Sequence, residues 1–210
     1  MIQGDPGTGK EIVARYIHQE SDRADMPFIV LNCAIMRPER LEIELFGAEA
    51  GIDGPEAQTG VLERAHQGTL LLDEIGDMPL ETQSKIVRVL QDQSFHRVGG
   101  HSLIHVDVRV LSSTNQDLEA LISEGAFRQD LYYRLSVVPI EIAPLKSRAK
   151  DIDELAHHFI EDFANHQGLP ARRVSAPALD MLRTYAWPGN VRQLRNVMEW
   201  IMIMSPAGDS

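Results

Sequence analysis

The sequence predicts an α/β protein in which a parallel sheet flanked by helices is followed by a small all-helical domain. Two observations predict this fold. Short apolar runs alternate with helical patterns through the first part of the chain, as in parallel sheets that carry a helix between successive strands. From residue 151 onward only helical patterns remain. The 210 residues are enough for one large and one small domain, and we expect these over residues 1–145 and 146–210.

The individual elements follow from apolar periodicity and from turn residues. The expected strands cover residues 28–31, 69–72, 106–112 and 137–142, with the remnant of a first strand at residues 2–3. The expected helices cover residues 10–20, 79–93, 118–124, 151–166, 176–186 and 191–204. Gly99 and Gly100 lie between apolar flanks and predict a β-hairpin turn. A motif that normally follows a strand begins at Gly4 already, so we interpret the chain as a fragment in which the first strand and the C-terminal end of the helical domain are truncated.

Charge and composition argue against several classes of protein. The chain has 31 acidic and 20 basic residues and a formal net charge of −11, which argues against a basic nucleic-acid-binding surface on this segment. Its single cysteine, Cys33, excludes an internal disulfide and fits a reducing cytoplasm. No apolar run approaches the ~20 residues that a membrane span requires. We therefore expect a cytoplasmic protein with no membrane partner.

A glycine-rich motif near the N-terminus predicts a phosphate-binding loop. It consists of Gly4, Asp5, Pro6, Gly7, Thr8, Gly9 and Lys10. Glycines allow successive backbone N–H groups to turn toward a phosphate, the lysine binds the β- and γ-phosphates, and the following helix N-terminus favours the same anion. The next position usually holds a Ser or Thr hydroxyl for Mg²⁺, but here it is Glu11. The alternative is a glycine-rich turn that merely precedes a lysine.

Polar side chains follow two of the expected strands. Asp73 and Glu74 end a buried apolar run, at the strand end where open α/β sheets bind ligands. Asp73 is a candidate Mg²⁺ ligand, and Glu74 is a candidate for polarising a water that attacks the γ-phosphate. Asn115, after the next strand, is a candidate sensor of the γ-phosphate or of that water. The alternatives are a solvated turn for the acidic pair and a turn or helix cap for Asn115.

The order and spacing of eight sequence blocks resemble one family, the AAA+ central domain of sigma-54-dependent transcription activators. The blocks are GDPGTGKE (4–11), LNCA (31–34), ELFG (44–47), GTLLLDEI (68–75), RVGG (97–100), VDVR (106–109), FRQDLYYRL (127–135) and WPGNVR (187–192). The resemblance covers essentially the whole chain. It implies a P-loop AAA+ sheet with a helical lid, the cofactors ATP or ADP and Mg²⁺, and Glu11 as a residue typical of the family.

The resemblance also implies roles for four further residues. Asn32 is similar to the family's switch asparagine, which pairs with the catalytic glutamate, here Glu74. Arg128 and Arg134 are similar to arginines that reach the ATP of a neighbouring subunit in a ring, typically a hexamer. Arg192 is similar to a lid arginine that reaches the phosphates of its own subunit. From the residues alone, these positions also fit a cap after a strand, surface arginines and a helix-terminal ion pair.

One family feature is absent from the sequence. In the family, the ELFG block is followed by a loop with the signature GAFTGA, which contacts the sigma factor. Residues 48–59 read AEAGIDGPEAQT, without the Phe-Thr pair, and predict a polar turn. Loss of this loop resembles the NtrX response regulators. It implies doubtful contact with sigma-54 RNA polymerase, DNA binding through a domain outside this chain, and a sensor kinase acting on a receiver domain, also outside it.

Two functional hypotheses remain open at this point. In the first, the chain is an ATPase, converting ATP to ADP and phosphate only as an oligomer. In the second, it is a nucleotide-binding oligomerisation module without significant turnover, in a regulator that acts by occupying DNA. A kinase on a P-loop scaffold fits less well, because nothing in the sequence resembles a pocket for a phosphate acceptor.

Overall fold

The structure, a computed structural model, describes residues 1–168 and 172–204. Its contacts divide these residues into two compact units. One, which we call the α/β unit, comprises Met1–Gln3 and Lys10–Glu141. The other, which we call the helical unit, comprises Gly4–Gly9 and residues 142–204. The phosphate-loop residues that precede Lys10 thus group with the C-terminal helices.

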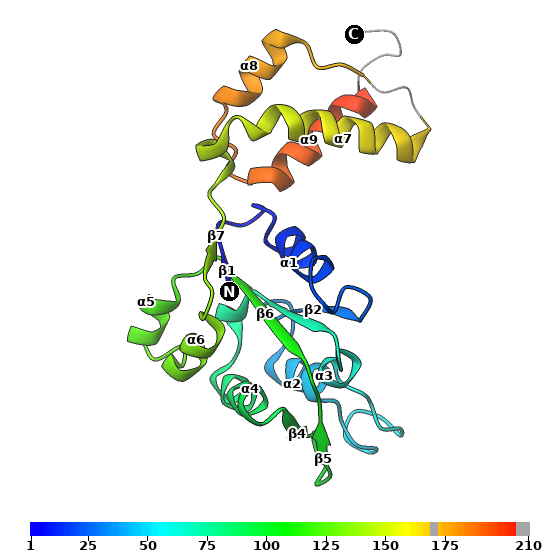
Figure 1. Cartoon of the computed structure of the whole chain (residues 1–210), viewed down its shortest axis with the longest axis vertical. Coiled ribbons are helices and arrows are strands. Elements are labelled where there is room, and N and C mark those ends of the chain that lie inside the picture. The colour runs from blue at the N-terminus through cyan, green and yellow to red at the C-terminus, as the bar shows by residue number, and fades with distance from the viewer. Residues whose placement is uncertain (169–171, 205–210) are drawn as a thin grey trace. The chain divides into compact units, whose positions relative to one another are not determined.

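Five parallel strands form the sheet of the α/β unit (Figure 1). They are β1 (Ile2–Gln3), β2 (Phe28–Asn32), β3 (Thr69–Asp73), β6 (Arg109–Thr114) and β7 (Ile140–Glu141), in the order β2-β3-β6-β1-β7. β3 lies between β2 and β6, and its side chains Leu70, Leu71 and Leu72 are completely buried. A continuous apolar run is typical of a parallel strand that is covered on both faces, and the predicted fold class is confirmed.

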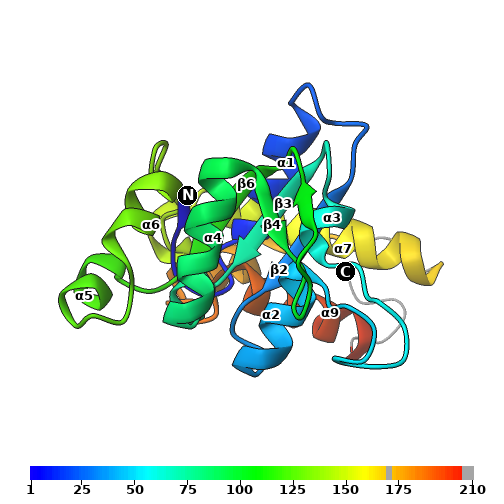
Figure 2. The same ribbon diagram turned by 90° about the horizontal axis from the view of Figure 1, so that it is seen from below.

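Helices cover both faces of this sheet. They are α1 (Lys10–Gln19), α2 (Pro38–Phe46), α3 (Val61–Arg64), α4 (Leu80–Asp92), α5 (Leu118–Ser123) and α6 (Gln129–Leu135), with a 3₁₀ turn, η1 (Ile75–Asp77), after β3. α1 packs on β1, β3 and β6, whereas α4 and α6 pack together on the opposite side of the sheet (Figure 2). This division follows from right-handed crossovers, because the chain moves along the sheet in one direction from β1 to β2 and in the other direction thereafter.

Two predicted strands differ from the observed ones. The expected strand 106–112 begins only at Arg109, because the N–H groups of Val106 and Val108 bond to Gln93 instead of to a strand. The expected strand 137–142 is reduced to β7, and Val137, at its predicted start, is 76% exposed. In residues 106–112 apolar residues alternate as in a strand, although the N–H groups of the first three residues bond to Gln93 and His66.

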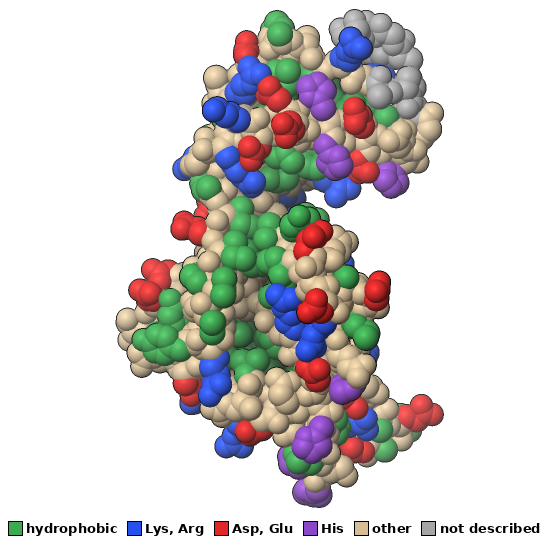
Figure 3. Space-filling view, in the orientation of Figure 1, with side chains coloured by type: hydrophobic (Ala, Val, Ile, Leu, Met, Phe, Trp, Pro, Cys, Tyr) green, Lys and Arg blue, Asp and Glu red, His purple; other side chains and the backbone are tan. Residues whose placement is uncertain are grey.

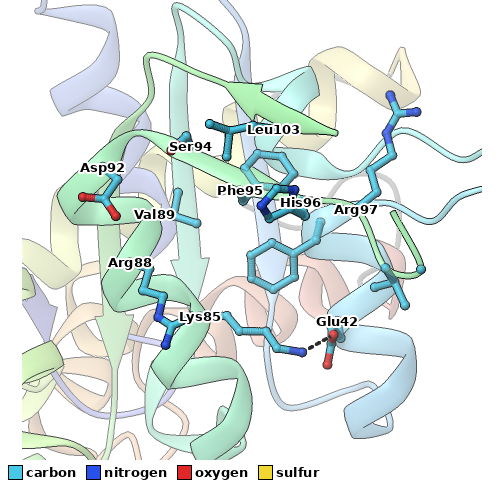
Figure 4. A pocket seen from close by; sticks show the side chains of 13 residues that line it. Glu42, Lys85, Arg88, Val89, Asp92, Ser94, Phe95, His96, Arg97 and Leu103 are labelled. Atoms are coloured by element: carbon cyan, nitrogen blue, oxygen red, sulfur yellow. Dashed lines mark hydrogen bonds and ion pairs between the residues drawn. The ribbon is translucent and has the colours of Figure 1, made fainter. Parts of the chain in front are cut away.

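The predicted hairpin is present as β4 (Ser94–His96) and β5 (Leu103–His105). Between α2, α4 and this hairpin lies a pocket of about 430 Å³. Figure 4 shows that Lys85 points toward Glu42, and these two side chains form an ion pair. The rings of Phe46 and Phe95 meet edge to face beside it. None of the predicted site residues lines this pocket.

The helical unit consists of the 3₁₀ turn η2 (Leu145–Arg148) and the helices α7 (Asp151–Gln167), α8 (Ala176–Thr184) and α9 (Asn190–Met204). α7 and α9 pack together around a core that includes Ile152, Trp187 and Leu194. Acidic, basic and histidine side chains are interspersed over the face drawn in Figure 3, and the ion pair Arg183–Asp153 links α8 to α7. Among the described residues, no helix is long and apolar enough to cross a membrane.

Candidate functional site

Three polar side chains form a row across the carboxyl ends of β2, β3 and β6. The Asn32 amide donates a hydrogen bond to Oδ2 of Asp73 (2.8 Å), and the Ser113 hydroxyl donates one to Oδ1 (2.5 Å). These strands are neighbours in the sheet, so residues in register at their ends point to the same face. The Asp73 carboxylate is therefore held from both sides by side chains.

The position of Asn32 differs from the expected one. The family resemblance implies a pair between Asn32 and Glu74, but in the structure the Asn32 amide donates to Asp73. The register accounts for this, since Asn32 lies directly opposite Asp73 on the neighbouring strand. Glu74 is one residue further along, and it has left the strand geometry.

Glu74 faces Lys10, the last residue of the predicted phosphate-loop motif. Its backbone adopts a left-handed conformation (φ 54°, ψ 54°), which is uncommon for a residue other than glycine and is often found at functional sites. Its Oε1 lies 3.3 Å from Nζ of Lys10, and its Oε2 accepts a hydrogen bond from the backbone N–H of Asn115 at 3.1 Å. Lys10 is 6% and Glu74 18% exposed. The three residues come from α1, the end of β3 and the end of β6.

Two predicted residues lie on the surface of the α/β unit. The side chain of Asn115 is exposed, while its backbone N–H contacts Glu74. Glu11 is exposed on the first turn of α1, where its carboxylate forms an ion pair with Arg15 at 2.7 Å. An exposed pair of this kind contributes little to stability. Glu11 thus points along the helix surface in this structure.

In the helical unit, the phosphate loop presents its carbonyl groups to residues near the C-terminal helices. Asn190 donates to the carbonyl of Pro6 at 3.0 Å, the N–H of Arg192 donates to that of Gly7 at 3.2 Å, and Arg148 donates to that of Thr8 at 2.9 Å. A trans peptide directs its N–H opposite to its C=O. The N–H groups of the same three peptides therefore point away from these donors, and that of Thr8 bonds to the carbonyl of Asp5 at 3.3 Å.

Asn190 is the centre of this arrangement. It is buried, it has a left-handed backbone (φ 50°), and its Oδ1 accepts a hydrogen bond from the N–H of Leu145 at 2.8 Å. Both ends of its amide are therefore used, one by η2 and one by the loop. Gly7 shows how close the loop approaches, because a Cβ at this position would lie 2.4 Å from the carbonyl oxygen of Gly189. Only glycine fits there.

The three predicted arginines are exposed and differ in their partners. Arg128 precedes α6 and is held by Asp130, which raises the pKa of the guanidinium through a hydrogen bond and lowers the pKa of the carboxyl group. Arg134, in the last turn of α6, has no side-chain partner within the described part of the chain. The same holds for the side chain of Arg192, although its backbone N–H binds the loop.

Asp73 is the candidate metal ligand among the predicted residues. In the ranges that the structure describes, no group of three or more His, Cys, Asp or Glu side chains could hold a metal. Proteins commonly bind Mg²⁺ through one or two carboxylates together with phosphate oxygens and water. The donor set at Asp73 therefore fits Mg²⁺ carried by a nucleotide.

Sequence reasoning missed three residues of these sites, namely Ser113, Arg148 and Asn190. Ser113 could have been found by aligning the two apolar runs at their ends. In the observed register Leu72 lies opposite Ser112, so Asp73 and Ser113 are the next residues on the two strands. Asn190 and Arg148 act on backbone carbonyls far away in the sequence. No local pattern announces such contacts.

The segment at residues 48–59 is fastened to the rest of the α/β unit. Ala48 forms bridges with Gln58 and with Val98 of the hairpin turn. Asp53 pairs with Arg40 of α2 at 2.5 Å. The side chain of Ile52 covers Gly99, where an added Cβ would lie 2.7 Å away from it. The segment is a closed turn with contacts to both of its neighbours.

Comparisons with known proteins agree with this architecture. Residues 1–141 match the model of the sigma-54 interaction domain, and residues 146–209 match that of an AAA+ ATPase lid domain. The nitrogen assimilation regulatory protein NtrX of Azorhizobium caulinodans is 51% identical over 205 residues, which are 98% of this chain and 45% of that protein. The regulatory protein AtoC of Escherichia coli is 46% identical over 207 residues, with the same coverage.

A solved structure resembles the whole chain. NtrX from Brucella abortus in complex with ADP has a TM-score of 0.93 and 50% identity, covering 100% of this chain and 46% of that one. The same protein in complex with ATP matches equally well. The chain spans less than half the length of these relatives. With its α/β part and its helical part both matched, the chain belongs to the sigma-54-activator family of AAA+ domains, as found in NtrX- and NtrC-type two-component regulators.

Proposed function

We propose that this chain is the ATP-binding and ATP-hydrolysing module of a two-component transcription regulator, active as an oligomer. The observation that carries the proposal is the approach of Lys10 to Glu74, 3.3 Å apart, with Asp73 next in sequence. It joins Lys10, the last residue of the glycine-rich motif, to the acidic end of β3. The ADP and ATP complexes of the Brucella abortus relative support the choice of nucleotide.

The proposed roles follow the chemistry of each group. Residues 4–9 bind phosphate oxygens through backbone N–H groups, and Lys10 adds a positive charge. Asp73 holds Mg²⁺, which neutralises phosphate charge when it is bound. Glu74 polarises the attacking water and Asn115 orients it. In this proposal residues 1–145 form the nucleotide-binding domain and residues 146–210 its lid, from which Arg192 reaches the phosphates.

The ion pair between Lys10 and Glu74 suggests how binding prepares the water. Both groups are largely buried, and a buried charge that loses its partner is costly. A phosphate that draws Lys10 toward itself replaces this partner, and it leaves the Glu74 carboxylate with the N–H of Asn115 and with water. Nucleotide binding and release of the general base are coupled in this way.

Assembly completes the proposed site. Arg128 and Arg134 are exposed at the two ends of α6, and we propose that they stabilise the transferring phosphoryl group of a neighbouring subunit in a ring, typically a hexamer in this family. Arg134 is available without rearrangement, whereas Arg128 has to leave Asp130. Arginines supplied in this way contribute about 10³- to 10⁵-fold to the rate.

The test is ATP turnover per subunit as a function of protein concentration, measured together with the mass in solution. We expect turnover to rise steeply as oligomers form, because the monomer lacks the arginines of a neighbour. Turnover that is constant from the monomer to the oligomer would contradict the assignment of the arginines. Absence of nucleotide binding would contradict the whole proposal.

A second candidate is a nucleotide-binding oligomerisation module without significant turnover. The observation that favours it is segment 48–59, which lacks the Phe-Thr tip and is held by Asp53 to α2 and by Ile52 to the hairpin. A fastened turn without an aromatic anchor is poorly suited to contact sigma-54 RNA polymerase. Tight nucleotide binding, assembly and no phosphate release would favour this candidate over the first.

The remaining proposed partners, a sensor kinase and DNA, would contact domains outside this chain. We propose a cytoplasmic regulator in which a receiver domain outside these residues accepts a phosphoryl group from a sensor kinase. A further domain binds DNA, consistent with the acidic net charge of this segment. Sequencing the gene on both sides of this chain tests this arrangement.

A further inference from the structure

We propose that Ser113, together with Asn32, is a positioning residue that fixes the direction of the Asp73 carboxylate for a magnesium–nucleotide complex. The inference rests on the proposed function, and it assigns a task to a buried hydroxyl that no motif singles out. It begins from the row across three strands, in which each oxygen of Asp73 accepts a side-chain hydrogen bond.

The sheet register makes this row possible. Asn32 is the register partner of Asp73, and Leu72 is the partner of Ser112, which places Ser113 beside Asp73 on the other neighbouring strand. Adjacent strands are about 4.8 Å apart, a spacing that short polar side chains can bridge. A small donor is needed on β6, and serine provides one without filling the space in front of the carboxylate.

Contacts of the donors fix which groups face the carboxylate. Oδ1 of Asn32 accepts a hydrogen bond from the backbone N–H of Ala34 at 2.9 Å, so the amide has to direct its NH₂ toward Asp73. Ser113 is 0% exposed, and a buried hydroxyl requires a partner. The carboxylate is its acceptor.

The two hydrogen bonds of the row orient the Asp73 carboxylate but leave part of its hydrogen-bonding capacity unused. An ionised carboxylate offers about four lone-pair positions, and Asp73 uses one on each oxygen for its two side-chain donors. One position on each oxygen remains for a ligand. With both oxygens bonded, rotation of the group about its own axis breaks two hydrogen bonds, so its direction is set before any ligand arrives.

Glu74 is held separately. Its contacts run to Lys10 and to the N–H of Asn115, not to the row. Loss of the Ser113 hydroxyl should therefore weaken Mg²⁺-dependent binding while the general base keeps its partners. Residues that orient a metal ligand typically contribute 10- to 100-fold to metal affinity.

The chain contains a matched control for this test. Ser112 is the preceding residue on the same strand, it is equally buried, and its hydroxyl has no hydrogen-bond partner within the described residues. Ser112→Ala and Ser113→Ala thus remove the same atom from neighbouring buried positions, and only the second change removes a bond to Asp73.

The experiment measures the dissociation constant of a fluorescent ADP analogue, with Mg²⁺ and with EDTA, for the parent chain and each variant. We expect Ser113→Ala to weaken binding about 10-fold in Mg²⁺ and to leave binding in EDTA unchanged. Ser112→Ala should match the parent in both conditions. Ser113→Thr, which keeps a hydroxyl, should restore Mg²⁺-dependent binding, and Asn32→Ala should reproduce the loss.

Two results would overturn the inference alone. One is parent-like binding by Ser113→Ala in Mg²⁺. The other is an equal loss in Mg²⁺ and EDTA, which would indicate a general effect on the fold. If the parent chain bound no nucleotide in either condition, the proposed function would fail and this inference with it.

Discussion

The two units hold their own candidate residues in opposite ways. In the α/β unit, side chains hold side chains, since Asn32 and Ser113 bond to Asp73, and Lys10 pairs with Glu74. In the helical unit, donors hold the backbone of residues 4–9 through its carbonyl groups. Side-chain contacts set the direction of reacting groups, whereas backbone contacts set the shape of a binding surface.

This difference leads to a division of labour that can be tested. Under the proposed function, changes to the general base or to the arginines of the α/β unit should reduce turnover, whereas changes to the row at Asp73 should reduce Mg²⁺-dependent nucleotide binding. Variants of the helical unit that release residues 4–9 should change nucleotide affinity, because we propose that this loop binds phosphate. The following predictions run from the largest expected effect to the smallest.

Arg134→Ala should have the largest effect. If this arginine acts on a neighbouring subunit, turnover in the assembled protein falls about 10³-fold or more, while nucleotide affinity stays within about twofold. Arg88→Ala, which changes an exposed arginine on α4 of the same unit, is the control and should leave both quantities unchanged. Equal turnover in the two variants would contradict the proposed role of Arg134.

Glu74→Gln tests the general base. The amide keeps the size of the side chain but cannot polarise water, so we expect turnover to fall about 10²- to 10⁴-fold. Nucleotide affinity should be retained or increased, since Lys10 loses an anionic competitor of the phosphate. Rates of phosphate release under saturating ATP give the measurement. A variant as fast as the parent would refute the assignment.

Asn190→Asp tests the helical unit. Aspartate keeps an acceptor for the N–H of Leu145 but loses the donor to the carbonyl of Pro6. Loss of one buried hydrogen bond corresponds to about 1 kcal/mol or slightly more, so we expect nucleotide affinity to fall about 10-fold. Turnover at saturating ATP should change less than affinity. A reversed pattern would break the proposed division between the units.

The smallest effect concerns the ion pair of Arg183 with Asp153, which lies on the surface of the helical unit. Hydrogen bonding to Arg183 lowers the pKa of Asp153, so the pair stabilises the fold above the ordinary aspartate pKa, and this stability is lost as pH falls through the lowered value. Thermal unfolding of Arg183→Ala should differ slightly from that of the parent at pH 7. The difference should shrink as the pH falls through the lowered pKa of Asp153, because the carboxyl group then becomes protonated and the ion pair is lost.

Long, periodic or strictly apolar segments could be predicted from the sequence. The buried run of β3 and the amphipathic α1, α4, α7 and α9 agree with expectation to within a few residues. The helices Pro38–Phe46 and Gln129–Leu135 were not predicted as elements, although both lie in or beside blocks that carry the family resemblance. They are short, and packing against neighbours stabilises such helices more than their own sequence does.

The candidate site was predictable where chemistry is concentrated in a motif. The phosphate loop, Asp73 and Glu74 were predicted from residue type and spacing, and the structure brings Lys10 within 3.3 Å of Glu74, while their roles stay predictions. The partner of Asn32 was not predictable from the family pattern, because strand register decides it. Ser113 and Asn190 are ordinary polar residues in sequence, and their contacts depend on strands or turns that only the fold brings together.

The buried thiol of Cys33 gives the α/β unit a chemical reporter of its own. Burial, and secondarily the charge of Asp73, raises the pKa of this thiol to about 12, so at pH 8 only about one molecule in ten thousand carries the reactive thiolate. Alkylation of Cys33 therefore requires local or global unfolding of the α/β unit. Both tryptophans of the chain, Trp187 and Trp200, belong to the helical unit. One sample can thus report the opening of each unit separately, by labelling and by fluorescence.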